Sequence, residues 1–333
     1  MNADTGPDRE SREKRLHPAL IDRVATEADG VISLRLVDPE GRILPSWTPG
    51  SHIDLQLASG LVRQYSLCGD PDDVTGYRIG VLLEPDGRGG SKEIHEKALV
   101  GVTLGARGPR NHFALQDAPS YLFLAGGIGI TPILAMARHV AHAGFPWKLV
   151  YGGRTRTSMA FVEELLALPG GTVELVPQDE RGMLDVDDIL TGTPTDTGVY
   201  CCGPEPMIRA VEVAAARHLP PNALHVERFG ATSVAKPAID TAGPGRAFEV
   251  ELRQSGVVLA VPPDQTLLEV VRTVCPDVLS SCEEGFCGAC EVGVLEGSPD
   301  HRDSILTDQE RERSETMIIC VGRSKSARLV LDL

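Results

Sequence analysis

The first third of the chain alternates apolar and polar residues as half-buried β-strands do. Three segments show this pattern most clearly, at residues 31–37, 52–57 and 77–83. Turn-forming residues at 38–41 and 49–50 separate the first two. Short alternating strands divided by such turns are typical of a small antiparallel barrel or sandwich. We therefore expect an antiparallel β-barrel domain over residues 16–117.

The pattern changes near residue 121, where apolar strands begin to alternate with helices. The expected strands lie at residues 121–125, 147–151, 172–176 and 198–202, and the expected helices at 132–143, near 159–168 and at 205–217. Strands that alternate with helices form a parallel, doubly wound sheet. We expect such an α/β domain over residues 118–232.

The last part of the chain follows a segment rich in Ala, Pro, Gly and Thr at residues 233–246, a composition typical of linkers. A hairpin is expected from residues 248–252 and 257–261, then a helix at 267–274 and a cysteine-rich loop. The pattern predicts a third domain over residues 247–333. The polar residues 1–15 are expected to be disordered.

Four cysteines in this third domain have the spacing of an iron–sulfur site. Cys282, Cys287 and Cys290 form a C-x4-C-x2-C run, and Cys320 follows on a later segment. This is the spacing of plant-type [2Fe–2S] ferredoxins. The residues between them include Gly285 and Gly288, and glycine lets the backbone approach a compact cluster closely. A structural zinc site is the alternative, but zinc sites use cysteine pairs at both ends of the motif.

Two motifs in the barrel domain suggest a flavin phosphate site. Alternation puts Arg63 and Tyr65 of the Arg63–Ser66 segment on one strand face, a cation beside a flat ring. The Gly89-Gly90-Ser91 turn precedes an expected helix, whose N-terminal amides bind anions. Taken alone, each motif is more typical of an ordinary strand or a glycine-rich turn.

Two further motifs lie at the carboxyl ends of strands in the α/β domain, the edge where ligands bind in such sheets. Gly126-Gly127-Ile128-Gly129 follows a buried strand, with Thr131 as the expected helix N-cap and Pro132 in the first helical turn. The glycines would let a dinucleotide approach the backbone. Cys202-Gly203-Pro204 ends a later strand, with Met207 just beyond it. A turn closed by prolines is the structural alternative.

The net charge and the hydropathy of the chain argue against several kinds of partner and against a membrane location. The net charge is −15, which argues against nucleic acid or an anionic membrane as a partner. Residues 247–333 hold 16 acidic and 8 basic residues, so this domain is the more acidic part and a candidate docking face for a basic partner. No apolar run is long enough for a membrane span, and residues 1–15 do not resemble a secretory signal. We expect a cytoplasmic protein.

Taken in order, these motifs resemble the phthalate dioxygenase reductase family, which includes the vanillate O-demethylase reductases. The resemblance runs from Pro18 to Leu333 and adds Val226-Glu227-Arg228-Phe229 to the motifs above. It implies an FMN-binding antiparallel barrel, a doubly wound nicotinamide domain and a β-grasp α+β ferredoxin domain. It also implies a [2Fe–2S] cluster on Cys282, Cys287, Cys290 and Cys320.

The resemblance also assigns roles around the flavin. Arg63 would bind the FMN phosphate, Tyr65 would pack on the ring and Ser66 would approach N5. The other residues implied at the FMN site are Val81, Leu83, Gly89, Gly90, Ser91, Thr131 and Phe229. Ser66, Thr131 and Cys202 are the residues implied at the site of hydride transfer.

On the nicotinamide side, Cys202 matches the cysteine near nicotinamide C4. The remaining residues implied there are Gly126, Gly127, Gly129, Arg154, Gly203, Pro204 and Met207. The family uses NADH, which we expect here, although Arg154 and Arg156 could accept the 2′-phosphate of NADPH. Cys201 is expected to be structural.

The resemblance implies that electrons pass from NADH through FMN and the cluster to the Rieske centre of a partner oxygenase, with the reductase as a monomer. Two alternatives remain open from the sequence. One is a stand-alone ferric or flavin reductase, and the other is an electron-carrier module without a dedicated oxygenase.

Overall fold

The computed structural model describes residues 16–229, 246–276, 278–280, 282–283, 285, 288–303 and 305–333. The chain divides into two compact units, residues 1–229 and 230–333, each of which is described by itself. Across the described ranges, no helix has the length and apolar character needed to cross a membrane.

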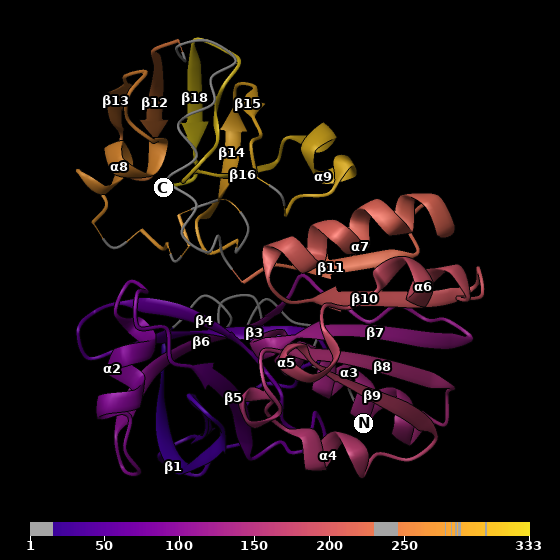
Figure 1. The fold of residues 1–333 in the computed structure, drawn as a ribbon. Coiled ribbons are helices and arrows are strands. Elements are labelled where there is room, and N and C mark those ends of the chain that lie inside the picture. Colours follow the sequence, from indigo (N-terminus) through magenta and orange to yellow (C-terminus); the bar gives the residue numbers. More distant parts are fainter. Residues whose placement is uncertain are drawn as a thin grey trace, which may run out of the picture. The chain divides into compact units, whose positions relative to one another are not determined.

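The first unit begins with a six-stranded antiparallel sheet in the order β4-β3-β6-β1-β2-β5 (Figure 1). Its elements are β1 (His17–Ala28), β2 (Val31–Val37), β3 (Ser51–Gln56), β4 (Val62–Ser66), β5 (Gly76–Leu82), α2 (Gly90–Lys97) and β6 (Thr103–Asn111). An isolated bridge between Leu67 and Ile79 joins the two edges of the sheet. The expected antiparallel barrel is therefore confirmed.

Strand β5 shows how alternation builds this barrel. Tyr77, Ile79 and Val81 are buried in the barrel core. Arg78 and Gly80 point to the other side, toward the α/β part of the unit, because successive side chains of a strand alternate.

The second half of this unit is a parallel sheet in the order β11-β10-β7-β8-β9, with every pairing parallel. The strands are β7 (Ser120–Gly126), β8 (Trp147–Gly153), β9 (Gly171–Pro177), β10 (Thr197–Cys202) and β11 (Leu224–Glu227). The helices are η1 (Gly127–Gly129), α3 (Ile130–Ala143), η2 (Arg156–Ser158), α4 (Val162–Leu166), α5 (Gln178–Arg181), α6 (Val186–Thr191) and α7 (Glu205–His218).

Helices cover both faces of this sheet, as a doubly wound fold requires. The core on the α3 face contains Phe123 and Tyr200, and it also takes in Val31 and Cys68 from the barrel. The core on the α7 face contains Leu124 and other apolar residues from the alternate strand positions. The core on the α3 face therefore reaches into the barrel, which also has an apolar core of its own.

The second unit is a mixed five-stranded sheet in the order β13-β12-β18-β14-β16, with a separate pair of short strands. Its elements are β12 (Phe248–Leu252), β13 (Val257–Val261), α8 (Leu267–Arg272), β14 (Glu291–Glu296), β15 (Pro299–Asp300), α9 (Asp308–Arg313), β16 (Thr316–Ile318), β17 (Arg323–Ser324) and β18 (Arg328–Leu331). α8 packs on the sheet through Leu267, Leu268 and Val271.

Some sequence expectations were wrong in detail. The helix expected near residues 159–168 is only α4, because Phe161 has a left-handed backbone with φ 62° and the helix begins after it. β1 and β6 were not predicted, because β1 mixes buried and exposed residues irregularly and β6 includes two glycines and a proline. Residues 1–15, and residues 233–245 of the linker expected at 233–246, fall outside the described residues.

Candidate functional site

The two motifs predicted for the flavin phosphate lie against each other. A Cβ atom built on Gly90 would be 2.6 Å from Nε of Arg63, so Arg63 packs directly on the first residue of α2. Its Nη2 also donates to the carbonyl of Arg88 at 2.8 Å. Gly89 has φ 82°, a conformation that glycine adopts without strain. The guanidinium and the N-terminal amides of α2 therefore form one cationic end of the barrel.

The other residues predicted for the flavin lie on β4 and β5. Tyr65 is half-buried at the edge of the barrel core. Val81 is buried in that core, and its carbonyl oxygen lies 3.0 Å from Nε2 of His95. Leu83 follows β5 and is half-buried, and the Ser91 hydroxyl accepts a hydrogen bond from the backbone amide of Glu84 at 3.0 Å.

Ser66 connects the barrel to a carboxyl group that was not predicted as a site residue. The Ser66 hydroxyl donates to Oε2 of Glu227 at 3.3 Å, and Ser66 is 5% exposed. Burial raises the pKa of Glu227 to about 8, although the hydrogen bond from Ser66 acts in the opposite direction. Glu227 was missed because its segment suggested only Phe229, the aromatic neighbour of a flavin.

The raised pKa of Glu227 predicts a pH-dependent stability. The native carboxyl binds a proton up to about pH 8, whereas the unfolded carboxyl releases it near pH 4.5. The native state therefore binds more protons between these values, and its stability falls as pH rises, by up to about 1.4 kcal/mol per pH unit. The Glu227→Gln variant should lack this fall, so its thermal unfolding midpoint should exceed that of the wild type at pH 8 and approach it at pH 5. Parallel melting profiles for the two proteins from pH 5 to pH 8 would contradict the assignment.

The two nicotinamide motifs meet backbone to backbone. β7 and β10 pair in parallel, with Ala125 opposite Cys202. A Cβ atom built on Gly129 would be 2.3 Å from the Cys202 carbonyl oxygen, and one built on Gly126 would be 2.7 Å from Sδ of Met207 and from Pro204. Both glycines therefore allow a close approach that a side chain would block. The two loops form one continuous surface at the carboxyl edge of the sheet.

Thr131 differs from the sequence expectation. It is not an N-cap, because α3 begins at Ile130 with Gly129 as its N-cap residue. The Thr131 hydroxyl instead donates back to the carbonyl of Ile128 at 3.0 Å. Its methyl group lies 2.8 Å from a Cβ atom built on Gly80 of the barrel. Pro132 is in the first helical turn, as expected.

The adjacent cysteines of β10 occupy opposite faces of the sheet. Cys202 is fully buried in the core on the α3 side, and Cys201 is fully buried in the core on the α7 side. Burial raises the pKa of the Cys202 thiol well above its usual range, so it stays protonated and contributes as a small neutral group. The apolar surroundings of Cys201 agree with the structural role expected for it.

Arg154 lies just beyond the tip of β8. The backbone amide of Asp179, in α5, donates to the carbonyl of Arg154 at 3.2 Å. This contact joins backbone atoms only, and Asp179 is exposed. Phe229 ends the described part of this unit and is 44% exposed.

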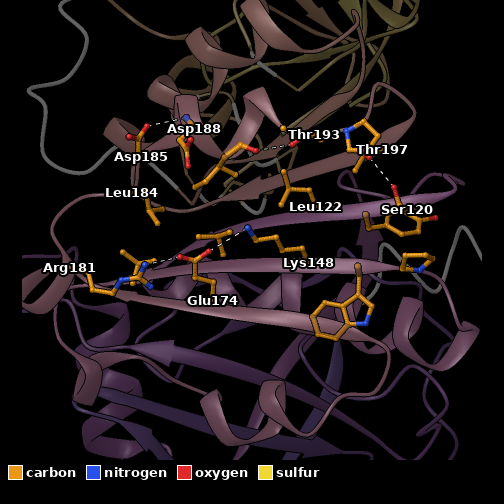
Figure 2. A pocket seen from close by; sticks show the side chains of 18 of the residues that line it. Ser120, Leu122, Lys148, Glu174, Arg181, Leu184, Asp185, Asp188, Thr193 and Thr197 are labelled. Carbon is orange, nitrogen blue, oxygen red and sulfur yellow. Dashed lines mark hydrogen bonds and ion pairs between the residues drawn. The ribbon is translucent and has the colours of Figure 1, made fainter.

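A pocket of about 630 Å³ lies on another part of the α/β domain, between the sheet and α6 (Figure 2). Its polar side chains pair with one another, since Glu174 accepts from Lys148 at 3.4 Å and from Arg181 at 2.9 Å. None of the predicted cofactor residues lines it. We do not assign the nicotinamide to this pocket.

In the second unit, three of the four predicted cluster ligands converge. Cys282, Cys290 and Cys320 are each no more than 4% exposed. The thiol of Cys320 lies within hydrogen-bonding range of the thiols of Cys282 and Cys290. Antiparallel pairing of β14 with β16 accounts for this, because Cys290 comes just before β14 and Cys320 just after β16. The fourth predicted ligand, Cys287, lies outside the described residues.

The loop around these cysteines suits a compact inorganic group. Gly285 and Gly288 have φ values of 79° and 70°, and Glu283 has φ 59°. A Cβ atom on Gly285 would collide with Val321 at 2.6 Å. Among the described residues, no group of three or more His, Cys, Asp or Glu side chains is placed to hold a metal ion. The buried thiols and the left-handed loop residues nevertheless fit a [2Fe–2S] cluster once Cys287 is added.

Two family models match this chain. Residues 123–213 match the oxidoreductase NAD-binding domain, and residues 250–325 match the 2Fe-2S iron-sulfur cluster binding domain. These ranges correspond to the parallel sheet with the two nicotinamide motifs and to the cysteine-bearing second unit. The expected fold class, an antiparallel flavin barrel with a nicotinamide domain and a ferredoxin domain, is confirmed.

Similar proteins cover almost the whole chain. The phenoxybenzoate dioxygenase subunit beta of Ectopseudomonas oleovorans is 43% identical, over 94% of this chain and 96% of that protein. The crystal structure of a phthalate dioxygenase reductase is 34% identical with a TM-score of 0.69, over 96% of this chain and 99% of that one. An intact type IV self-sufficient cytochrome P450 monooxygenase is 42% identical with a TM-score of 0.87, over the whole of this chain, which spans only 43% of that protein.

Proposed function

Because the chain belongs to the phthalate dioxygenase reductase family, we propose that it is the NADH-dependent reductase component of a Rieske-type oxygenase system. In this role it carries electrons from NADH through FMN and a [2Fe–2S] cluster to the terminal oxygenase. We also propose that it acts as a monomer in the cytoplasm, where thiol ligands stay reduced.

The proposal assigns each cofactor to one domain. The domain limits are 16–117 for the FMN barrel, 118–232 for the nicotinamide domain and 247–333 for the ferredoxin domain. Arg63 and the turn Gly89–Ser91 would hold the FMN phosphate, and Cys282, Cys287, Cys290 and Cys320 would hold the cluster. Bound FMN accepts two electrons together and releases them singly, and the cluster accepts one at a time.

One observation carries the hydride-transfer part of the proposal. Thr131, from the loop and helix that follow the glycine motif, packs its methyl group on Gly80 of the barrel. The nicotinamide elements and the flavin elements therefore meet directly within one compact unit. A hydride passes only between groups that are held almost in contact, and this junction is where such contact can be made.

The residues around this junction would position the reactants. Gly126 and Gly129 let the glycine loop pack directly on the Cys202–Gly203 turn, and the surface that these two loops form is where we place the dinucleotide. Ser66 and the protonated Glu227 supply a hydrogen-bonding pair on the barrel side. Cys202, buried and neutral, adds no charge beside the cationic ring of NAD⁺.

The preference for NADH over NADPH is also part of the proposal. The family resemblance supports NADH. A preference for NADPH would instead need a cation, such as Arg154 or Arg156, at the 2′-phosphate.

A cytochrome P450 haem domain is a second candidate acceptor. The likeness of the whole chain to part of a self-sufficient P450 supports it, because the matched part there is joined to further sequence in one protein. The two candidate functions differ only in the protein that accepts the electrons, because the path from NADH to the cluster would be the same in both.

Anaerobic mixing with NADH tests the proposal. The flavin absorbance should bleach within one turnover, and purified Rieske oxygenases, supplied with their aromatic substrates, should then be reduced. P450 haem domains serve as the comparison acceptors. If NADH fails to bleach the flavin, the reductase assignment is wrong, and if no Rieske protein is reduced while a P450 is, the assigned partner is wrong.

A further inference from the structure

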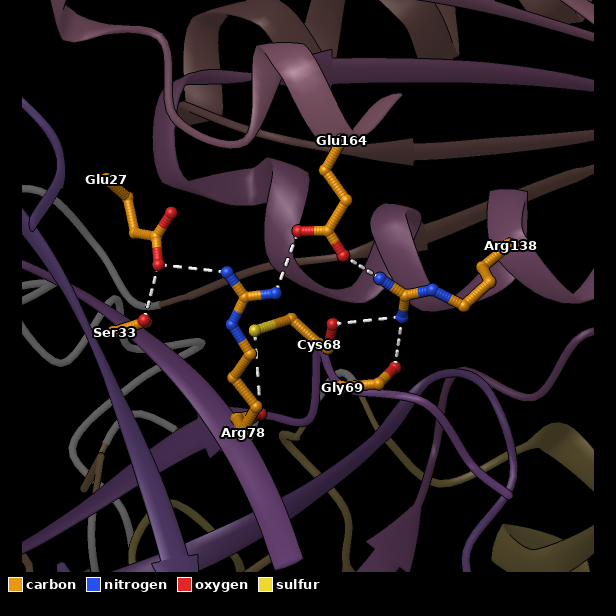
Figure 3. A network of polar contacts seen from close by, with 7 residues as sticks. All are labelled: Glu27, Ser33, Cys68, Gly69, Arg78, Arg138 and Glu164. Carbon is orange, nitrogen blue, oxygen red and sulfur yellow. Dashed lines mark hydrogen bonds and ion pairs between the residues drawn. The ribbon is translucent and has the colours of Figure 1, made fainter. Parts of the chain in front are cut away.

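A network of charged side chains joins the barrel to the α/β part of the first unit (Figure 3). Arg78 of β5 donates to Oε2 of Glu164 on α4 at 2.8 Å and to Oε1 of Glu27 on β1 at 2.9 Å. Glu27 also accepts from Ser33 at 2.5 Å. Two of these residues come from opposite sides of the junction, because Arg78 belongs to the barrel and Glu164 to the parallel-sheet domain.

Glu164 holds a second cation from its own side. Its Oε1 accepts from Nη2 of Arg138 on α3. Arg138 is 8% exposed, and its other terminal nitrogen donates to the backbone carbonyls of Cys68, at 3.3 Å, and Gly69 of the barrel. One carboxylate thus binds an arginine from each domain, and one of these arginines also holds the barrel backbone.

This network lies next to the contact between the flavin and nicotinamide elements. Arg138 is two helical turns from Thr131, so the two residues share one face of α3. Gly80 follows Arg78 at the next position on the same face of β5. The network and the Thr131–Gly80 contact are therefore held by the same two elements.

Phe161 links the charged network to the contact between Gly80 and Thr131. It precedes α4 in a left-handed conformation, and its ring carbons lie 3.2 and 3.3 Å from a Cβ atom built on Gly80. The guanidinium of Arg78 lies 4.8 Å from the centre of the same ring. A shift of α4 relative to β5 would thus move Phe161 across Gly80, at the contact with Thr131.

We propose that Glu164 is a positioning residue for hydride transfer, which it serves by holding Arg78 of the barrel and Arg138 of α3 at once and so fixing the spacing between Gly80 and Thr131. The inference rests on the proposed function. The step it positions oxidises NADH to NAD⁺ by loss of one hydride, which the flavin gains, and Glu164 itself exchanges no proton.

Physical chemistry makes this spacing sensitive to Glu164. Without the carboxylate, Arg78 and Arg138 face each other as like charges in a partly buried place, and the strands and helices that carry them are pushed apart. Hydride transfer is sensitive to such a separation, since a displacement of about 1 Å lowers the rate roughly 100-fold. The loops proposed for the dinucleotide, at Gly126–Gly129 and Cys202–Gly203, include none of the residues of this network, so binding should change much less than rate.

The test compares Glu164→Gln with Glu174→Gln by stopped-flow reduction of the bound flavin. Glu174 is a matched control, because it also binds two cations, is 38% exposed against 31% for Glu164, and has both partners within the α/β domain. We expect Glu164→Gln to lower the limiting rate about 10-fold or more, with an NADH dissociation constant within about twofold of wild type. It should keep a primary isotope effect with NADH deuterated at C4. Glu174→Gln should match the wild type.

A second variant changes the spacing and leaves the charges in place. The Cβ atom of Gly80→Ala would meet the Thr131 methyl group at 2.8 Å. This variant should slow hydride transfer as well. Amide hydrogen exchange supplies a readout independent of turnover, because residues 76–82 and 130–143 should exchange faster in Glu164→Gln while residues 205–218 do not.

The outcomes separate this inference from the proposed function. Wild-type rates in Glu164→Gln overturn the positioning role, and so does a slow rate that comes with lost FMN or a large rise in the NADH dissociation constant, which marks a general structural defect. Failure of NADH to reduce the wild-type flavin overturns the proposed function, and this inference falls with it.

Discussion

Replacement of Cys290 by alanine is expected to abolish electron delivery to one-electron acceptors while NADH still bleaches the flavin. Cys290 is 2% exposed, and its thiol lies beside that of Cys320. A plant-type cluster needs four thiolates, so loss of one prevents its assembly. NADH-dependent reduction of cytochrome c should fall at least ~100-fold, because the path to the acceptor passes through the four-thiolate site.

The measurement has two parts, rapid-mixing reduction of the flavin and steady-state reduction of cytochrome c. Cys275→Ala is the matched control, because Cys275 lies in the same domain, is half-buried and does not belong to the C-x4-C-x2-C spacing. Iron and sulfide analysis should find two of each in the control and neither in Cys290→Ala. Undiminished cytochrome c reduction in Cys290→Ala would show that the electrons take another route.

Local spacing made much of the site predictable. The cysteine run, the paired phosphate motifs and the two nicotinamide motifs each lie within a few residues, where strand and helix periodicity relates them directly. The structure then adds what spacing cannot supply, namely that Arg63 packs on Gly90 and that Gly129 packs on Cys202. The second contact follows from the sheet order, which joins β7 to β10 across a long stretch of sequence.

The residues that sequence reasoning missed share one property, which is that their partners are distant in the chain. Burial raises the pKa of Glu227, and its hydrogen-bond partner Ser66 belongs to the barrel. Glu164 reaches Arg78 from another domain. A carboxylate in a strand or a short helix is usually solvated, so its pattern alone predicts a surface residue.

The other large effect is expected for Gly129→Ala, which should nearly eliminate flavin reduction by NADH while FMN stays bound. The new methyl group would lie 2.3 Å from the Cys202 carbonyl oxygen and 2.7 Å from the Gly203 amide nitrogen. These are backbone atoms of a paired strand, so neither can rotate away as a side chain could. Relief requires the two loops to separate, at a cost of about 1–3 kcal/mol or more.

Separation of these loops removes the surface proposed for the nicotinamide, and a displacement of about 1 Å already lowers such rates roughly 100-fold. The FMN phosphate residues Arg63 and Gly90 lie on the barrel and keep their contact, so the variant should remain yellow. Stopped-flow reduction over a series of NADH concentrations measures both affinity and limiting rate. Gly192→Ala is the control, since a Cβ atom there meets nothing within 4 Å and φ is −90°. A Gly129→Ala protein that is reduced within twofold of the control rate would refute the assignment of the Gly129–Cys202 contact to the nicotinamide site.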